Sequence, residues 1–200
     1  MKFDQNIPIA ESYQDALLIF KTDAYRLYGK IFKTFRVLSL VLHNRCLRFL
    51  FFFRMAQYKG GCGYRIFVRI CNYYGGKYGL MIYPETKIGY GLYLGHGINT
   101  LINTSAVLGN NINLSHGVSL GANDSKAAVI GDNVYIAPNV CTVGNCHIGD
   151  CSTIGAGSVV TRDIPENKTA VGVPARVIGD SHPEYIGNAM SMDDFKKLLK

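Results

Sequence analysis

Two histidines in this chain are spaced so that they could share one catalytic site. His96 and His116 each lie two residues after a leucine, Leu94 and Leu114. An imidazole has a pKa near neutrality, so it can take a proton from a hydroxyl group and release it again within one reaction. Whether the two rings can act together depends on the elements that carry them, and the sequence around them indicates what those elements are.

A six-residue repeat runs from about Ile88 to Val160. Its units resemble Ile130-Gly-Asp-Asn-Val-Tyr, with an aliphatic residue first, a small residue second, and a small or aliphatic residue fifth. Hexapeptide periodicity is typical of a parallel β-helix, in which each unit is a short strand plus a turn and three units make one coil of a triangular prism. The expected inward positions are Ile88, Leu94, Ile102, Leu108, Leu114, Leu120, Ile130, Ile136, Thr142, Ile148, Ile154 and Val160.

The repeat predicts that the two histidines are stacked. Leu94 and Leu114 are separated by one coil of 18 residues plus a two-residue insertion near residues 97–100. His96 and His116 should therefore occupy the same position in consecutive coils, about 4.8 Å apart. The alternative is that one or both are ordinary surface histidines.

A second insertion, of four residues, is predicted to protrude as a loop within Gly121–Ala128. Insertions in a solenoid form surface loops and often carry the site. The next two coils place Pro138 and Ala156 in the histidine column.

The first third of the chain lacks the repeat and carries most of the positive charge. Residues 1–78 have 13 Lys and Arg against 4 Asp and Glu, whereas residues 79–200 have 8 against 10. We expect an N-terminal helical domain over 1–78, with helices over Tyr13–Tyr28 and Lys30–Tyr58. We expect a parallel β-helix over 79–178 and a C-terminal tail over 179–200.

The segment Phe35–Ala56 is the most apolar of the chain, but arginines interrupt it too often for a transmembrane span. Two interpretations compete: a helix that packs in the core or in an oligomer, and a helix that rests on an anionic membrane. The excess of positive charge in 1–78 indicates an anionic neighbour. We expect no nucleic-acid partner.

The six cysteines form no CxxC pair, and the start of the chain lacks the pattern of a signal peptide. We therefore expect free thiols in the cytoplasm, with the protein either soluble or peripheral on the inner face of the membrane. The cluster of Cys141, Cys146, His147 and Cys151 matches no zinc-finger or zinc-ribbon spacing. We expect no metal.

Four segments resemble one family of enzymes. They are Tyr83-Pro-Glu-Thr-Lys-Ile-Gly-Tyr-Gly-Leu-Tyr-Leu-Gly-His96, His116-Gly-Val-Ser-Leu-Gly121, Ile154-Gly-Ala-Gly-Ser-Val-Val160 and Ala170-Val-Gly-Val-Pro-Ala-Arg176. Over residues 80–178 the chain is similar to the serine acetyltransferase branch of the hexapeptide acyltransferases. It also resembles the O-acetyltransferases of capsule, exopolysaccharide and lipopolysaccharide gene clusters.

The resemblance implies a left-handed β-helix and an acetyl-CoA-dependent enzyme that transfers acetyl directly to a hydroxyl group. It implies a homotrimer, which could pair into a dimer of trimers, with acetyl-CoA in the groove between neighbouring prisms. His96 matches the family's general base, and His116 could contact the acceptor, share the proton or be the base itself. The positions that match CoA contacts are Gly121, Pro138, Ala156, Thr161, Arg162, Pro174 and Arg176.

The departures from the family concern the acceptor. Serine acetyltransferases have aspartates where Met81 and Gly95 stand, and the loop Gly121–Ala128 lacks their Arg-His pair. An amino-acid zwitterion needs paired charges, so we expect a carbohydrate hydroxyl as acceptor. The expected acceptor contacts are Asn99, Asn123 and Asp124.

The sequence leaves two questions open. His96 could be oriented by a backbone carbonyl, Tyr83, Glu85 or Asn99. The alternative functions are a serine O-acetyltransferase of cysteine biosynthesis and a non-catalytic or metal-binding β-helix.

Overall fold

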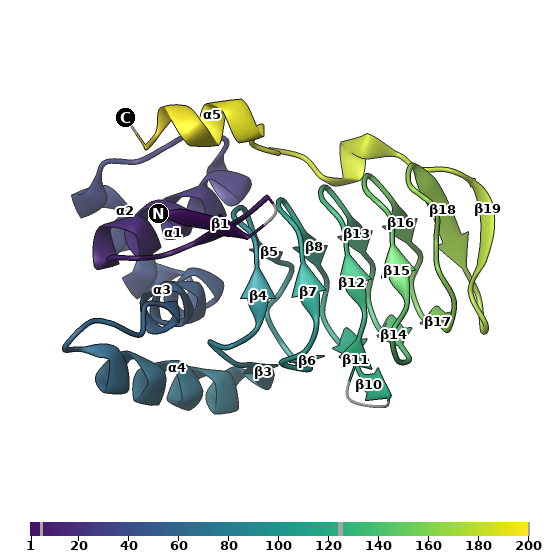
Figure 1. The fold of residues 1–200 in the computed structure, drawn as a ribbon, viewed down its shortest axis with the longest axis horizontal. Helices are drawn as coiled ribbons and strands as arrows, with labels where there is room; N and C mark the ends of the chain where they lie inside the picture. The colour runs from purple at the N-terminus through teal and green to yellow at the C-terminus, as the bar shows by residue number, and fades with distance from the viewer. Residues whose placement is uncertain (5, 124–125, 200) are drawn as a thin grey trace.

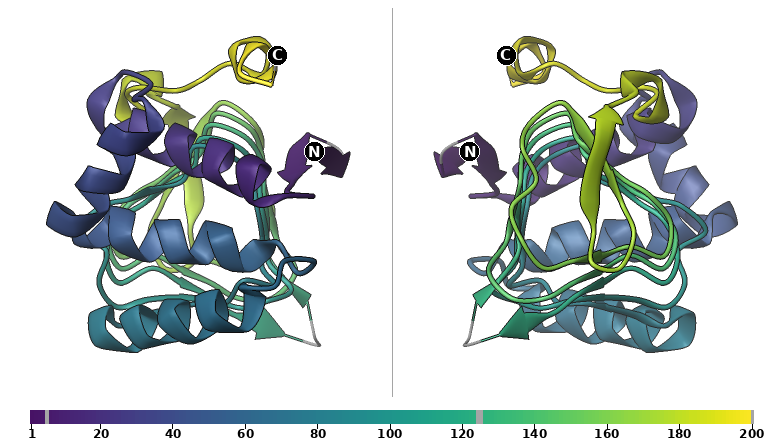
Figure 2. Two further views of the ribbon diagram at one scale, coloured as in Figure 1. Left: turned by 90° about the vertical axis from the view of Figure 1, so that its left-hand side faces the viewer. Right: turned by 90° about the vertical axis from the view of Figure 1, so that its right-hand side faces the viewer.

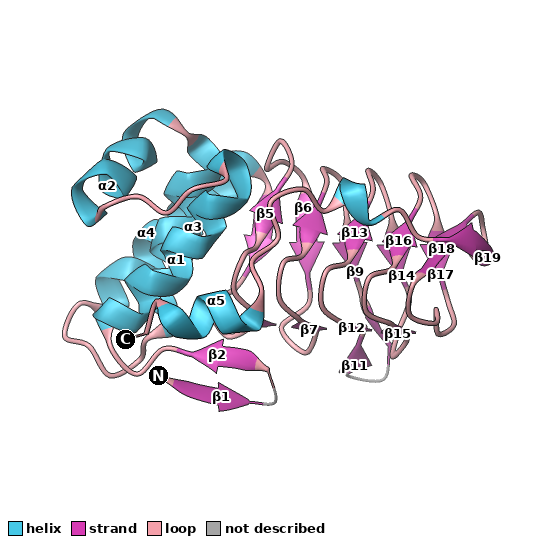
Figure 3. Cartoon of the chain, turned by 90° about the horizontal axis from the view of Figure 1, so that it is seen from above, coloured by secondary structure: helices cyan, strands magenta, loops and turns pink. Residues whose placement is uncertain are grey.

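The chain folds into a group of helices that covers one end of a three-sided prism of strands (Figure 1). In this computed structural model, residues 1–4, 6–123 and 126–199 are described. The C-terminal segment leaves the far end of the prism and returns along it to the helices (Figures 1 and 3). An N-terminal hairpin of β1 (Lys2–Asp4) and β2 (Ile7–Ile9), which we did not predict, lies beside it.

The helices before the prism are α1 (Tyr13–Tyr28), α2 (Thr34–His43), α3 (Arg45–Gln57) and α4 (Tyr64–Tyr78). Helix α1 has the predicted bounds, but the predicted helical stretch Lys30–Tyr58 is divided. Asn44 has an extended backbone, and its side chain accepts a hydrogen bond from the backbone N–H of Leu47. This is the N-cap geometry that asparagine favours, and it begins a new helix.

Helix α4 lies in the predicted helical domain but outside the two helices that we expected there. The helix runs through Gly75 and Gly76 and ends at Gly79, which has φ of 68°. A side chain at Gly75 would place its Cβ 2.7 Å from the carbonyl oxygen of Leu80. Gly75 therefore allows α4 to lie directly against the first strand of the prism.

The prism is a parallel β-helix, as the repeat predicted, and its triangular section is seen along the axis in Figure 2. The first sheet contains β4 (Lys87–Ile88), β7 (Val107–Leu108), β12 (Val129–Ile130) and β15 (His147–Ile148). The second contains β5 (Tyr93–Leu94), β8 (Asn113–Leu114), β13 (Tyr135–Ile136), β16 (Thr153–Ile154), β18 (Lys168–Val171) and β19 (Arg176–Asp180). The third contains β3 (Leu80–Ile82), β6 (Thr100–Ile102), β9 (Ser119–Leu120), β14 (Cys141–Thr142) and β17 (Val159–Val160).

The predicted inward positions are confirmed, since every one of them is buried. The register pairs them directly, for example Leu94 with Leu114 and Leu114 with Ile136. Thr142 is the polar member of this set, and its hydroxyl is buried without a hydrogen-bond partner among the described residues. The column of aliphatic side chains therefore supplies the core of the prism.

The two insertions lie where the repeat predicted them. The first forms a turn in which His96, Gly97 and Asn99 have φ of 64°, 50° and 50°. The second forms a hairpin of β10 (Ala122–Asn123) and β11 (Lys126–Ala127) that projects from the prism (Figure 1). Asp124 lies outside the described residues.

After β18, strand β19 pairs antiparallel and ends the prism. A 3₁₀ turn (Pro183–Tyr185) and helix α5 (Met192–Lys197) follow. Phe195 of α5 stacks on Tyr90 at a ring distance of 4.3 Å, which fixes the C-terminal segment against the first coil.

A buried ion pair joins the helices to the prism. Arg54 of α3 donates to both carboxylate oxygens of Asp23 of α1, at 2.9 and 3.1 Å, and also to the carbonyls of Ile88 and Gly89. Asp23 accepts a further bond from the backbone N–H of Leu92. A buried pair with its hydrogen bonds satisfied fixes one arrangement of the groups that it joins.

The core-packing interpretation of Phe35–Ala56 is confirmed for the part that forms α3. Leu47, Phe49, Leu50 and Phe53 are buried against the other helices and the first coil. Arg54 points into the protein and has no role at a headgroup. No helix within the described part of the chain is both long enough and apolar enough to cross a bilayer.

Candidate functional site

The structure brings the two predicted histidines together. The rings of His96 and His116 lie 5.6 Å apart between centroids, with an interplanar angle of 71°. They follow paired residues of adjacent strands, Leu94 in β5 and Leu114 in β8, so the register of the prism sets their separation. The predicted placement of the two imidazoles one coil apart is confirmed, and the rings meet edge to face.

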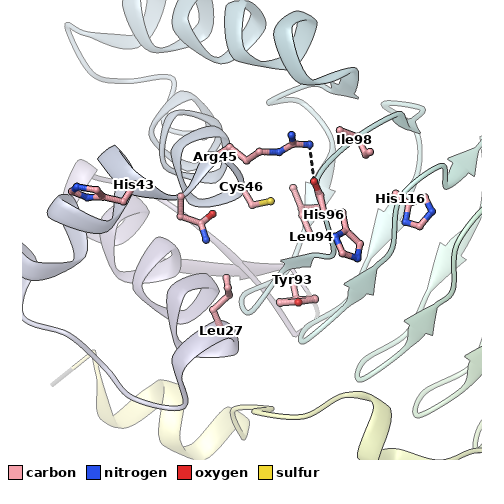
Figure 4. A pocket seen from close by; sticks show the side chains of 10 residues that line it. Leu27, His43, Arg45, Cys46, Tyr93, Leu94, His96, Ile98 and His116 are labelled. Atoms are coloured by element: carbon pink, nitrogen blue, oxygen red, sulfur yellow. Dashed lines mark hydrogen bonds between the residues drawn. The ribbon is translucent and has the colours of Figure 1, made fainter.

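Both imidazoles line a pocket of about 690 Å³ between the prism and the helices (Figure 4). One wall comes from the prism and the other from α1, the end of α2 and the start of α3. The lining residues are Leu27, His43, Asn44, Arg45, Cys46, Tyr93, Leu94, His96, Ile98 and His116. Residues of both regions are therefore needed to form this pocket.

The turn that carries His96 is held by Arg45. The Arg45 guanidinium donates to the carbonyl oxygen of His96 at 2.7 Å (Figure 4). It also donates to the carbonyl oxygen of Gly97 at 2.9 Å and lies over the ring of Tyr78. A non-glycine residue with positive φ is unfavourable and persists only where its surroundings fix it. Arg45 therefore stabilises the conformation from which the His96 side chain projects.

Cys46 packs against the same turn. A Cβ added at Gly97 would lie 2.6 Å from the Cys46 sulfur, and the φ of 50° also favours glycine at this position. Burial raises the pKa of the Cys46 thiol, which keeps it neutral and makes it a packing group rather than a nucleophile.

None of the three side chains expected to orient His96 bonds to its ring. Within residues 1–4, 6–123 and 126–199, Tyr83, Glu85 and Asn99 make no hydrogen bond to the imidazole, whereas Arg45 bonds to the backbone of the turn. No sequence pattern points to Arg45, since a bond to a carbonyl oxygen requires no particular residue type at positions 96 and 97.

His116 has an unsatisfied ring atom. Its Nδ1 is buried and has no hydrogen-bond partner within the described part of the chain. A buried polar atom without a partner costs about 1–3 kcal/mol, so a bound molecule or water that reached it would be favoured. His116 is thus suited to hold a polar group near His96.

The pocket is neutral to basic. Of the described residues that line it, none is Asp or Glu, whereas Arg45 and three histidines are present. Met81 and Gly95 stand where serine acetyltransferases were expected to have aspartates. Met81 is half-exposed in β3, and Gly95 directly precedes His96. Such a lining offers no carboxylate to an ammonium group.

The predicted CoA positions fall in two columns and at the far end of the prism. Pro138 and Ala156 continue the column of His116, because Leu114, Ile136 and Ile154 are paired in register.

Gly121 and Thr161 form the second column, at the corner that follows β9, β14 and β17. Arg162 and Pro174 are exposed, as is Arg176 of β19, so both guanidinium groups are accessible to an anion. Their role in binding CoA stays a prediction.

The predicted acceptor contacts are dispersed. Asn99 belongs to the His96 turn and Asn123 to β10, and neither lines the pocket. Asp124 is outside the described residues. No group of three or more His, Cys, Asp or Glu in the described ranges is arranged to hold a metal ion.

The known proteins that are similar to this chain are hexapeptide-repeat transferases. Residues 127–162 match the family described as bacterial transferase hexapeptide (six repeats). Serine acetyltransferase 3, mitochondrial, of Arabidopsis thaliana is 43% identical over 101 residues, which are 48% of this chain and 26% of the relative. The serine acetyltransferase of Bacillus subtilis is 36% identical over 104 residues, 50% of this chain and 48% of the relative. The chain spans less than half of the length of these relatives.

Solved structures agree with this result. The serine acetyltransferase of Neisseria gonorrhoeae in complex with serine has a TM-score of 0.66 and 31% identity, covering 83% of this chain and 69% of that one. The Brucella abortus enzyme in complex with coenzyme A has a TM-score of 0.67 and 26% identity, covering 85% of this chain and 69% of that one.

These relatives and structures are serine acetyltransferases and do not support the expected resemblance to capsule, exopolysaccharide or lipopolysaccharide O-acetyltransferases. What they share with this chain is the hexapeptide prism preceded by helices. The repeat, the paired histidines and these similarities together show that the chain belongs to the hexapeptide-repeat acyltransferases.

Proposed function

We propose that this protein is an acetyl-CoA-dependent O-acetyltransferase that uses His96 as general base. The observation that carries the proposal is the pair of imidazoles, 5.6 Å apart, in a pocket lined by both regions of the chain. The similarity to a serine acetyltransferase solved with coenzyme A supports the choice of acetyl donor. A homotrimer with acetyl-CoA between neighbouring prisms is part of this proposal.

The reaction is a direct transfer. The neutral imidazole of His96 removes the proton of the acceptor hydroxyl as its oxygen attacks the thioester carbonyl carbon. The C–O bond forms, a backbone N–H stabilises the oxyanion of the tetrahedral intermediate, and the C–S bond then breaks. The proton passes from the imidazolium to the CoA thiolate, so the enzyme returns to its starting state without a covalent intermediate.

His116 has a supporting role in this mechanism. Its ring lies beside that of the base, and its Nδ1, which has no partner among the described residues, can bond to an acceptor or water molecule that reaches it. This role predicts that His116 affects acceptor binding more than the proton transfer itself.

L-Serine is the acceptor that the comparisons favour. The relatives named above are serine acetyltransferases, and the Neisseria gonorrhoeae structure contains serine. Among the residues that line the pocket, Arg45 is the cation that could bind the carboxylate of serine. Its guanidinium already donates hydrogen bonds to two carbonyl oxygens.

A carbohydrate hydroxyl is the second candidate, and one observation favours it. The described lining of the pocket has no carboxylate to pair with the ammonium group of an amino acid, and its volume of about 690 Å³ exceeds what a small amino acid fills. A neutral polyol would need only hydrogen-bonding partners there.

An acceptor screen decides between the two candidates. The purified protein is incubated with acetyl-CoA and with L-serine, nucleotide sugars or oligosaccharides, and released CoA thiol is followed with a disulfide reagent. His147→Ala, an exposed histidine of the prism, serves as the matched control for substitutions in the pocket. Turnover with serine alone supports the first candidate, turnover with sugars alone the second, and no turnover with any hydroxyl acceptor refutes the proposed activity.

A further inference from the structure

The outer face of helix α2 is apolar and uncovered. Phe35 is 87% exposed, Leu42 71% and Leu38 39%. Because they are three, four or seven residues apart, they lie along one stripe of the helix. Val37 and Val41 of the same helix are buried in the core, so the helix has an apolar inner face and a second apolar face toward solvent.

The chain around this stripe is strongly basic. Residues 24–84 contain no Asp or Glu. Lys30, Lys33 and Arg36 flank the stripe and are exposed. Within the described ranges these three cations take part in none of the salt bridges. The surface therefore combines large apolar side chains with positive charge that its own protein does not neutralise.

We propose that the stripe of Phe35, Leu38 and Leu42, with Lys30, Lys33 and Arg36, docks on the surface of an anionic lipid membrane. Aromatic and aliphatic side chains of a surface helix insert at the boundary of headgroups and acyl chains, while lysine and arginine bind anionic headgroups. A second copy of the chain fits this surface less well. A symmetric interface would bring the same cations of two copies against each other.

This surface adjoins the candidate active site. His43, the last residue of α2, follows Leu42 and lines the pocket with the two catalytic histidines. Docking through α2 would hold that side of the pocket near the lipid headgroups, where a hydroxyl carried by a lipid could reach it. This consequence rests on the proposed function, whereas the docking itself does not.

A tryptophan reporter tests the docking directly, because the chain contains no tryptophan. Phe35→Trp places a single indole on the stripe. Tyr73→Trp, at a residue of α4 that is 63% exposed, is the matched control. We expect vesicles of phosphatidylcholine with phosphatidylglycerol to shift the emission of Phe35→Trp to the blue, and brominated lipids to quench it. Tyr73→Trp should show neither effect, and phosphatidylcholine alone should give a much smaller shift.

A charge variant tests the electrostatic part. The triple variant Lys30→Glu/Lys33→Glu/Arg36→Glu should lower the affinity for the anionic vesicles, measured by cosedimentation, by about tenfold or more. The matched control carries the same charge change on α4: Arg65→Glu, Arg69→Glu and Lys77→Glu.

Three results would overturn the proposal. They are emission of Phe35→Trp that ignores the vesicles, equal weakening by the two charge variants, and a blue shift that appears without lipid as the protein concentration rises. The last would assign the stripe to a second copy of the chain. None of these readouts requires turnover. The experiments can therefore refute the docking while the acetyltransferase activity is present, and can support the docking while that activity is absent.

Discussion

Different interactions stabilise the prism and the helical part. In the prism, backbone ladders align each coil on the next and aliphatic side chains stack in columns such as Leu94, Leu114 and Ile136. In the helical part, apolar side chains also form a core, but single contacts that do not repeat, above all the buried pair of Asp23 and Arg54, set its position on the prism. A repeated contact tolerates the loss of one member better than a single contact does.

The candidate site depends on both kinds of order. The prism sets the distance between the two imidazoles through its register, and the helices supply Arg45, which fixes the turn of His96. The expected consequence is that a change in either region alters the site, but through different measurable quantities. The predictions below use this difference, beginning with the largest effect.

Removing the buried cation should cost the most stability. Arg54→Met leaves the carboxylate of Asp23 buried without its partner, and we expect a loss of about 3–5 kcal/mol in the free energy of unfolding. Burial already raises the pKa of Asp23, so the orphaned carboxyl should take up a proton at higher pH than in the wild type. Urea denaturation followed by circular dichroism measures the change.

The double variant Asp23→Leu/Arg54→Met is the control for this prediction, because it removes both charges. It should regain most of the stability lost in Arg54→Met. A single variant as stable as the wild type would show that the pair does not anchor the helices.

Arg45 should affect turnover and leave stability nearly unchanged. Arg45→Ala frees the carbonyls of His96 and Gly97, and we expect kcat to fall about 10- to 100-fold through a misplaced base. Steady-state kinetics on the acceptor found in the screen measures this, and Arg45→Lys should recover part of the loss.

Arg48→Ala is the matched control for Arg45→Ala. Arg48 lies one turn along α3 and also stacks on a tyrosine, but it bonds to Val41 and Tyr78 instead of the His96 turn. Equal losses of kcat in the two variants would mean that the helix as a whole, and not the bond to the turn, matters.

Cysteine labelling compares the opening of the two regions. Cys71 of α4 and Cys146 of the prism are both buried, and burial, with a smaller effect of Glu85, raises the pKa of Cys71 to about 12. In mild denaturant we expect Cys71 to react with a thiol reagent about tenfold faster than Cys146, because the helical part opens first. Mass spectrometry of labelled peptides measures both rates, and faster labelling of Cys146 would reverse the comparison.

The smallest predicted effect tests the column inside the prism. Thr142→Val replaces a buried hydroxyl without a partner by a methyl group, so we expect a gain of about 1 kcal/mol. Thr153→Val is its counterpart, since the Thr153 hydroxyl bonds to Ser181 and its removal should destabilise. In thermal unfolding, we expect a higher Tm for Thr142→Val and a lower Tm for Thr153→Val than for the wild type, and a lower Tm for Thr142→Val would contradict the prediction.

The sequence predicted the prism well because each coil repeats one physical requirement. An inward residue at every sixth position predicted the core, the register and the placement of His96 and His116 one coil apart. Insertions stood out as breaks in that period, so the His96 turn and the hairpin of β10 and β11 were located in advance.

The helical part was predicted less well because its contacts connect distant residues of ordinary type. The division at Asn44 depends on one capping bond, and α4 continues through Gly75 because of a close approach that only the folded chain reveals. Arg45 binds carbonyl oxygens 51 and 52 residues away, for which no side-chain pattern exists.

The central claim is that His96, placed by the prism and fixed by the helices, removes the proton of the acceptor. The most direct measurement is single-turnover acetyl transfer by His96→Ala, with coenzyme A binding measured by calorimetry on the same sample. We predict a rate reduced by about 10³-fold or more, unchanged coenzyme A affinity, and full activity of His147→Ala. A His96→Ala variant that retains turnover, with the loss found instead in His116→Ala, would contradict the assignment of the base.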